Sequence, residues 1–70
     1  MEQQDVERIA RAALKELGVG AELVVAPLEG HPDRWRIEIP GTRGLTIKGG
    51  QGTTPQWVRQ QIFEQYLAQN

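Results

Sequence analysis

Apolar and polar side chains alternate strictly in two short stretches near the middle of the chain, and this feature limits the possible fold most. Residues 35–39 read WRIEI and residues 45–48 read LTIK, so every second side chain is apolar in both. The stretch between them, 40–44, is rich in turn-forming residues. Alternation with a period of two on both sides of a turn predicts neighbouring antiparallel strands. One face of such a sheet is covered by the core and the other is exposed to water.

A third strand is expected before this pair. Residues Ala21–Ala26 place Leu23 and Val25 on one face, and Pro27 is the expected end of the strand. Residues 28–33 read LEGHPD and are expected to form a loop, because Gly and Pro are concentrated there. The three strands together predict an antiparallel meander.

Residues 4–17 have apolar side chains at three- and four-residue spacing, which predicts a helix with one buried face. Asp5 is the expected N-cap and Gly18 the expected end. The predicted buried face comprises Val6, Ile9, Ala10, Ala13, Leu14 and Leu17. The opposite face carries the three cations of the helix, Arg8, Arg11 and Lys15. These cations either form an external basic stripe or pair with the flanking carboxylates.

A second helix is expected at the end of the chain. Thr53 is the predicted N-cap, Gln56 would complete a capping box with it, and Pro55 suits the first turn. The predicted buried face comprises Val58, Ile62, Phe63, Tyr66 and Leu67. On a helical wheel Trp57 points away from this arc, whereas Arg59 points close to it.

The order helix–strand–strand–strand–helix predicts an α+β fold, with a three-stranded antiparallel sheet and two helices packed on one of its faces. We expect residues 1–70 to form a single domain, because 70 residues leave no room for a second one. The absence of Cys excludes disulfides, and a single His makes a structural zinc site implausible, so no metal or cofactor is expected. The sequence contains neither a signal peptide nor an apolar run of about 20 residues, which predicts a soluble, cytoplasmic protein.

The charges are unevenly distributed although the chain is close to neutral. Residues 1–33 carry three basic and seven acidic side chains, whereas residues 34–59 carry five basic side chains and one acidic one. Six of the eight basic residues are Arg, which is better suited than Lys to bidentate contacts with phosphate. This distribution either indicates an anionic partner or reflects ordinary solvation of the surface.

Two segments carry a resemblance to a known family. Residues 29–41, EGHPDRWRIEIPG, are similar to a Gly-Pro-x-His loop followed by an alternating strand and a glycine. Residues 50–59, GQGTTPQWVR, align without a gap with the motif Gly-x-Gly-x-Ser-Lys-Lys-x-Ala-Lys. These motifs and the order of elements resemble the double-stranded-RNA-binding domain over nearly the whole chain. The chain departs from this family at Pro55 and Gln56, which replace two lysines, and at His31, which is displaced in the loop.

The resemblance implies a non-catalytic module that binds structured RNA, or another structured nucleic acid, through its shape and its phosphates. Binding is expected to be weak and to depend strongly on salt, because two family lysines are missing. The candidate nucleic-acid-binding residues are Arg8, Arg11, Lys15, His31, Lys48 and Arg59.

Two other functions are compatible with the residues. A small protein-interaction or inhibitor protein could use Trp57, Gln60 and Gln61 of the last helix, or the solvent face of the strands. In that case Trp57 is exposed, whereas in a purely structural role it folds back over the strand ends. HicA-type messenger-RNA interferases also share this fold, and Gly30-His31 resembles their glycine and active histidine. His31 would then be catalytic, but no second acid or base stands at a suitable spacing, so this hypothesis ranks third.

Overall fold

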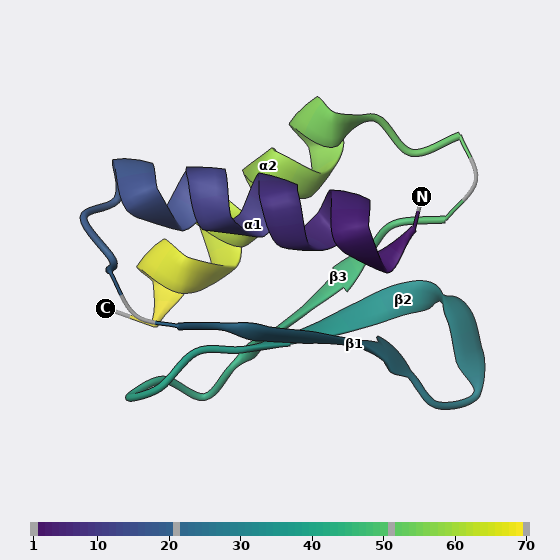
Figure 1. Ribbon diagram of the computed structural model, residues 1–70, viewed down its shortest axis with the longest axis horizontal. Coiled ribbons are helices and arrows are strands. Elements are labelled where there is room, and N and C mark those ends of the chain that lie inside the picture. Colours follow the sequence, from purple (N-terminus) through teal and green to yellow (C-terminus); the bar gives the residue numbers. More distant parts are fainter. Residues whose placement is uncertain (1, 21, 51, 70) are drawn as a thin grey trace.

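The computed structural model of this chain describes residues 2–20, 22–50 and 52–69. Its elements follow in the order α1 (Gln3–Glu16), β1 (Val24–Leu28), β2 (His31–Glu38), β3 (Leu45–Lys48) and α2 (Pro55–Ala68). The strands form one antiparallel sheet in the order β1-β2-β3, and both helices lie on the same face of it (Figure 1). The predicted α+β fold is confirmed, and one face of the sheet is left uncovered by any helix.

Strand β1 lies later in the sequence than expected. The prediction began at Ala21, which lies outside the described residues, whereas the strand runs from Val24 to Leu28. The prediction that Pro27 ends the strand is wrong, because Pro27 continues it and lies opposite Trp35. β1 is an edge strand, where the missing N–H of proline costs no hydrogen bond of the ladder.

The first turn is much shorter than the predicted loop over residues 28–33. It consists of Glu29 and Gly30, and Gly30 has the positive φ of +81° that glycine adopts readily. His31 is therefore the first residue of β2, opposite Leu28, and not a loop residue. The register of the β1–β2 pair then shifts, so residues 32–34 bulge away from β1.

The alternation that predicted β2 and β3 is confirmed by burial. Trp35, Ile37 and Ile39 are buried against the helices, and so are Leu45 and Ile47 of β3. The Trp35 indole Nε1 donates a hydrogen bond of 3.0 Å to the Gly49 carbonyl, which satisfies the buried polar atom of this ring. The side chains at the intervening positions therefore face the open side of the sheet.

Both predicted helices are present, but their N-caps differ from the predictions. In α1 the N-cap is Glu2, and Asp5 is the residue that completes the capping box at the third helical position. In α2 the N-cap is Thr54 and not Thr53, and the Thr54 hydroxyl accepts a hydrogen bond of 3.2 Å from the Trp57 amide. Gly18, with a φ of +79°, follows the end of α1 as expected.

The core lies between the two helices and the sheet. Its buried residues come from both helices, from all three strands and from the residues next to β1 and β2; they are Val6, Ala10, Ala13, Leu14, Leu23, Val25, Trp35, Ile37, Ile39, Leu45, Ile47, Val58 and Ile62. Ile9, Leu17, Phe63 and Tyr66 are partly buried against them, as predicted. Leu67 is an exception, because it is exposed on α2 and does not contribute to the buried face.

Candidate functional site

The exposed face of α1 carries Arg8, Arg11 and Lys15, on the side of the helix away from the core. Arg8 pairs with the carboxylate of Asp5, with 3.4 Å between Arg8 Nη2 and Asp5 Oδ1. Glu7 and further carboxylates flank the same face. Arg8 is therefore the paired member of the basic stripe, and acidic side chains lie along the same helix.

Arg59 joins the two helices. Its guanidinium forms an ion pair with the carboxylate of Glu16 at the end of α1. The guanidinium carbon also lies 4.8 Å from the centre of the Phe63 ring, in a cation–π arrangement. Arg59 was a predicted nucleic-acid contact, but the structure engages its charge in the packing of α1 against α2.

His31 and Lys48 lie on strands of the sheet, not on α1. His31 is exposed at the start of β2, close in sequence to two carboxylates, Glu29 and Asp33. Lys48 is exposed on the open face of the sheet, because Leu45 and Ile47 of the same strand point toward the helices. The six predicted nucleic-acid-binding residues therefore do not share one surface.

The open face of the sheet brings Lys48 together with two arginines that the sequence analysis did not select. Arg34 lies directly opposite Lys48 on the neighbouring strand, and Arg36 lies opposite Thr46. We refer to Arg34, Arg36 and Lys48 as the sheet cation cluster. Part of this cluster could have been identified from the sequence, because strand alternation places Arg36 and Lys48 on the face opposite the core.

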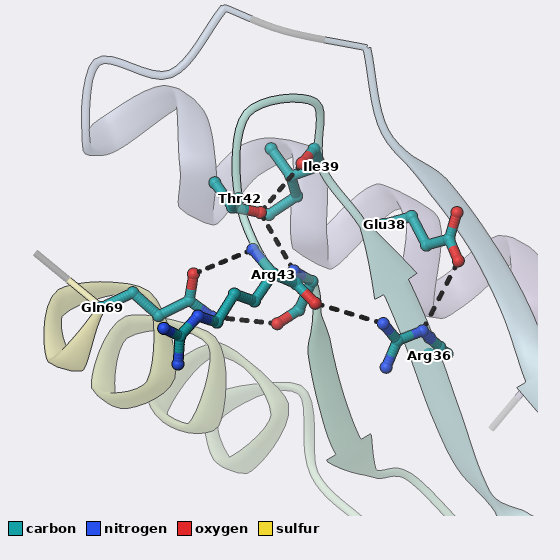
Figure 2. A network of polar contacts seen from close by, with 7 residues as sticks. Arg36, Glu38, Ile39, Thr42, Arg43 and Gln69 are labelled. Carbon is teal, nitrogen blue, oxygen red and sulfur yellow. Dashed lines mark hydrogen bonds and ion pairs between the residues drawn. The ribbon is translucent and has the colours of Figure 1, made fainter.

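Arg36 is held in place by polar contacts at the end of the sheet, which Figure 2 shows with its partners. Its Nε lies 3.5 Å from Glu38 Oε1, and its Nη2 donates a hydrogen bond of 3.1 Å to the carbonyl of Arg43 in the β2–β3 turn. In the same turn, the Thr42 hydroxyl donates to the Ile39 carbonyl at 2.8 Å and accepts from the Gly44 amide at 3.1 Å. The hydrogen-bonded turn thus places Arg43 beside Arg36, next to a shallow hollow of about 450 Å³.

Arg34 and Lys48 are different from Arg36 in their ionic environment. Within residues 2–20, 22–50 and 52–69, no carboxylate lies within ion-pair distance of either side chain. Two like charges directly opposite each other on a sheet destabilise it. The pair of Arg34 and Lys48 is therefore the position where the open face has the strongest uncompensated positive charge.

Two glutamines of α2 and the glutamine at its C-cap bind the edge of β3 and the turn before it. Gln61 accepts a hydrogen bond from the Lys48 amide and donates one to the Lys48 carbonyl, both at 2.9 Å. Gln65 makes the same two bonds with Thr46, at 3.1 and 2.6 Å. Gln69 accepts from the amide of Arg43 at 3.3 Å and donates to the carbonyl of Gly44 at 2.9 Å, as Figure 2 shows. These side-chain amides replace the backbone of a fourth strand.

The spacing of these glutamines fits the strand. Four residues of a helix rise about 6 Å, and two residues of a strand rise about 6.6 Å, so every fourth helical residue meets every second strand residue. Gln61 was predicted to contact a protein partner, but it is buried and its amide is used within the chain. The repeat of Gln61, Gln65 and Gln69 is the sequence signal that would have identified this role.

The opposite edge of the sheet is also protected. Gln3 of α1 donates a hydrogen bond of 2.7 Å from its Nε2 to the carbonyl of Val25 in β1. Pro27 in the same strand has no N–H to offer to another strand. With both edges blunted, the open face is the part of the sheet best suited to a ligand.

The outer face of α2 carries the remaining predicted interaction residues. Trp57 is 47% exposed, which confirms that its side chain points away from the core. Gln60 is exposed and donates a hydrogen bond of 3.0 Å to Glu64 one turn later. The structure therefore separates Trp57 and Gln60 from Gln61, which faces β3.

Comparison of the chain with protein families, with curated proteins and with solved structures finds no match. Within the described residues there is no group of three or more His, Cys, Asp or Glu side chains that could hold a metal ion. No helix in the described part of the chain has the length and apolar character needed to cross a membrane. The likeness to double-stranded-RNA-binding domains is thus a prediction from the sequence.

Proposed function

We propose that this protein is a non-catalytic binding module that takes the phosphate backbone of a structured nucleic acid, an RNA duplex in particular, on the open face of its sheet. The observation that carries this proposal is the position of Arg34 directly opposite Lys48 on that face. The resemblance of the sequence to double-stranded-RNA-binding domains supplies the expectation of RNA.

The energetics of the sheet support a ligand at this position. Two like charges directly opposite each other destabilise a sheet. A phosphate between Arg34 and Lys48 would reverse this sign, because each cation then faces an anion. Arg36 extends the cluster along β2, and a guanidinium can contact phosphate with two parallel hydrogen bonds.

The charges favour the open sheet face over the helical surface that the family resemblance implies. On the helical side, Arg8 is paired with Asp5 and Arg59 with Glu16. A polyanion on that side would have to displace or face these acids. On the open face, Glu38 pairs with Arg36, and Glu22 lines the same hollow. Among the described residues, no carboxylate lies within ion-pair distance of Arg34 or Lys48.

Binding of a labelled RNA duplex of about 16 base pairs, followed by fluorescence anisotropy, tests the proposal. Three phosphate contacts predict a slope of about −2.7 for log K against log salt, so affinity should fall about 40-fold between roughly 50 and 200 mM salt. Arg34→Gln and Lys48→Gln should each reduce the magnitude of the slope by about 0.9.

Arg11→Gln is the matched control, because it removes one exposed positive charge from α1 and leaves the sheet unchanged. We expect its slope to equal that of the unmodified chain. If Arg11→Gln reduces the magnitude of the salt slope and Arg34→Gln and Lys48→Gln leave it unchanged, binding lies on the helical side and the proposal is contradicted.

A further inference from the structure

The outer face of α2 carries large apolar side chains that the core does not use. Trp57 is 47% exposed and Leu67 is 56% exposed. Gln60 and Glu64 lie between them along the helix and are exposed as well. On a helical wheel these four side chains fall within an arc of about 80°, so they form one stripe, which we call the outer stripe.

The outer stripe is symmetric about its centre. Trp57 and Leu67 lie five residues before and after Ile62, and Gln60 and Glu64 lie two residues before and after it. When two such helices pair antiparallel around a twofold axis near Ile62, Trp57 of one copy meets Leu67 of the other. In the same register, Gln60 meets Glu64. Each contact then occurs twice, which is the requirement for a twofold interface.

We propose that the outer stripe binds a second copy of this chain and forms an antiparallel α2–α2 homodimer. Two Trp–Leu contacts would bury the exposed apolar side chains, and Trp is a frequent centre of binding energy in interfaces. The polar pair is complementary, because the amide of Gln60, which donates to Glu64 within one copy at 3.0 Å, can also donate to that carboxylate across the axis. Arg59 does not interfere, since its charge is paired with Glu16 on the α1 side.

The length of α2 limits the surface area that the dimer can bury. The 14 residues of α2 span about 21 Å, and one helix of this length covers less than the roughly 800 Å² per partner of a standard interface. We therefore expect a weak, transient dimer. Because α2 lies on the helical side of the sheet, dimerisation leaves the open face of both copies accessible.

Sedimentation equilibrium of the full chain between 10 µM and 1 mM tests the homodimer. The average mass should rise with concentration from 7.9 kDa toward twice that value. Trp57→Ser and Leu67→Ser should each weaken association by at least tenfold. Val24→Ser is the control, because Val24 is 62% exposed on the sheet and lies outside the outer stripe, so association should not change. Circular dichroism establishes that every variant is folded.

Two substitutions at Gln60 test the register of the pair. Gln60→Lys places a cation opposite Glu64 of the second copy and should strengthen association, whereas Gln60→Glu places an anion there and should weaken it. A monomeric protein at 1 mM would overturn the proposal, and so would Trp57→Ser or Leu67→Ser variants that associate like the unmodified chain. Equal shifts in the same direction for Gln60→Lys and Gln60→Glu would overturn the antiparallel register.

Discussion

The side chain of Gln61 shows how one residue type can have opposite roles within a single helix. Its amide is buried and forms two hydrogen bonds with the backbone of Lys48, while Gln60 next to it is exposed and bonds within the helix. The two positions differ by about 100° around the helix, which is enough to exchange solvent for the edge of β3. Neighbouring glutamines of α2 therefore differ, because Gln61 binds the edge of β3 whereas Gln60 faces solvent.

Replacing Gln61 with the similarly sized Met should therefore destabilise the fold. Gln61→Met leaves the N–H and the C=O of Lys48 without their partners, and we expect a loss of about 1–3 kcal/mol in the free energy of unfolding. Urea denaturation measures this loss. Gln56→Met, at an exposed position of the same helix, should change stability by less than about 0.5 kcal/mol. Equal effects of the two substitutions would contradict the role assigned to Gln61.

Arg59 has a structural role at the residue scale, and this gives a second prediction. Arg59→Glu places a carboxylate beside Glu16 and removes the cation from the face of Phe63, so it should destabilise the protein. We expect a loss of about 1 kcal/mol, because exposed ion pairs contribute little individually.

The double variant Arg59→Glu with Glu16→Arg should recover part of that loss, as a double-mutant cycle by urea denaturation would show. RNA affinity, measured where each variant is folded, should not change with Arg59→Glu. A lost affinity in a fully folded Arg59→Glu variant would instead assign Arg59 to the binding surface.

At the scale of the elements, the two consecutive threonines before α2 have different roles. The hydroxyl of Thr54 caps the Trp57 amide, and the Thr54 carbonyl accepts the bond from the Val58 amide. Thr54→Ala should lower the free energy of unfolding by about 1 kcal/mol, whereas Thr53→Ala should have a smaller effect. Urea denaturation of both variants checks this, and a larger loss for Thr53→Ala would place the cap one residue earlier.

The sequence predicts the elements well wherever periodicity alone determines them. The alternation over residues 35–39 and 45–48 identifies β2 and β3 and their buried faces, and the bounds of β3 agree with the prediction. The limits of β1 and the state of His31 were wrong, because Pro27 is tolerated at a sheet edge and a two-residue turn suffices at Glu29-Gly30. The limits of β1 and the position of His31 depend on which strand lies at the edge of the sheet, and the pattern of a single strand does not reveal the strand order.

At the scale of the whole molecule, the site was harder to predict than the fold. The cations of residues 34–48 could be grouped from the sequence, and alternation could place Arg36 and Lys48 on the open face. The position of Arg34 opposite Lys48 requires the register of β2 and β3, which depends on the tertiary structure. The pairing of Arg59 with Glu16 depends on how α1 packs against α2, so the sequence offered Arg59 as a free cation.

The arrangement of charges divides the molecule into two sides. On the helical side, Arg8 and Arg59 are paired with acids. On the open sheet face, Arg36 is paired with Glu38, whereas Arg34 and Lys48 have no carboxylate among the described residues within ion-pair distance. The edges of this sheet are protected by Gln3, Gln61, Gln65 and Gln69. This division explains how a chain with a net charge of −1 can still carry a locally positive face.

An amide-resolved NMR titration with an RNA duplex of about 16 base pairs at low salt tests this account most directly. The account predicts that shifts concentrate in β2 and β3 around Arg34, Arg36 and Lys48 and fade as salt rises. Shifts confined to α1 and the start of α2, or a folded spectrum that does not respond to the duplex at low salt, would contradict it.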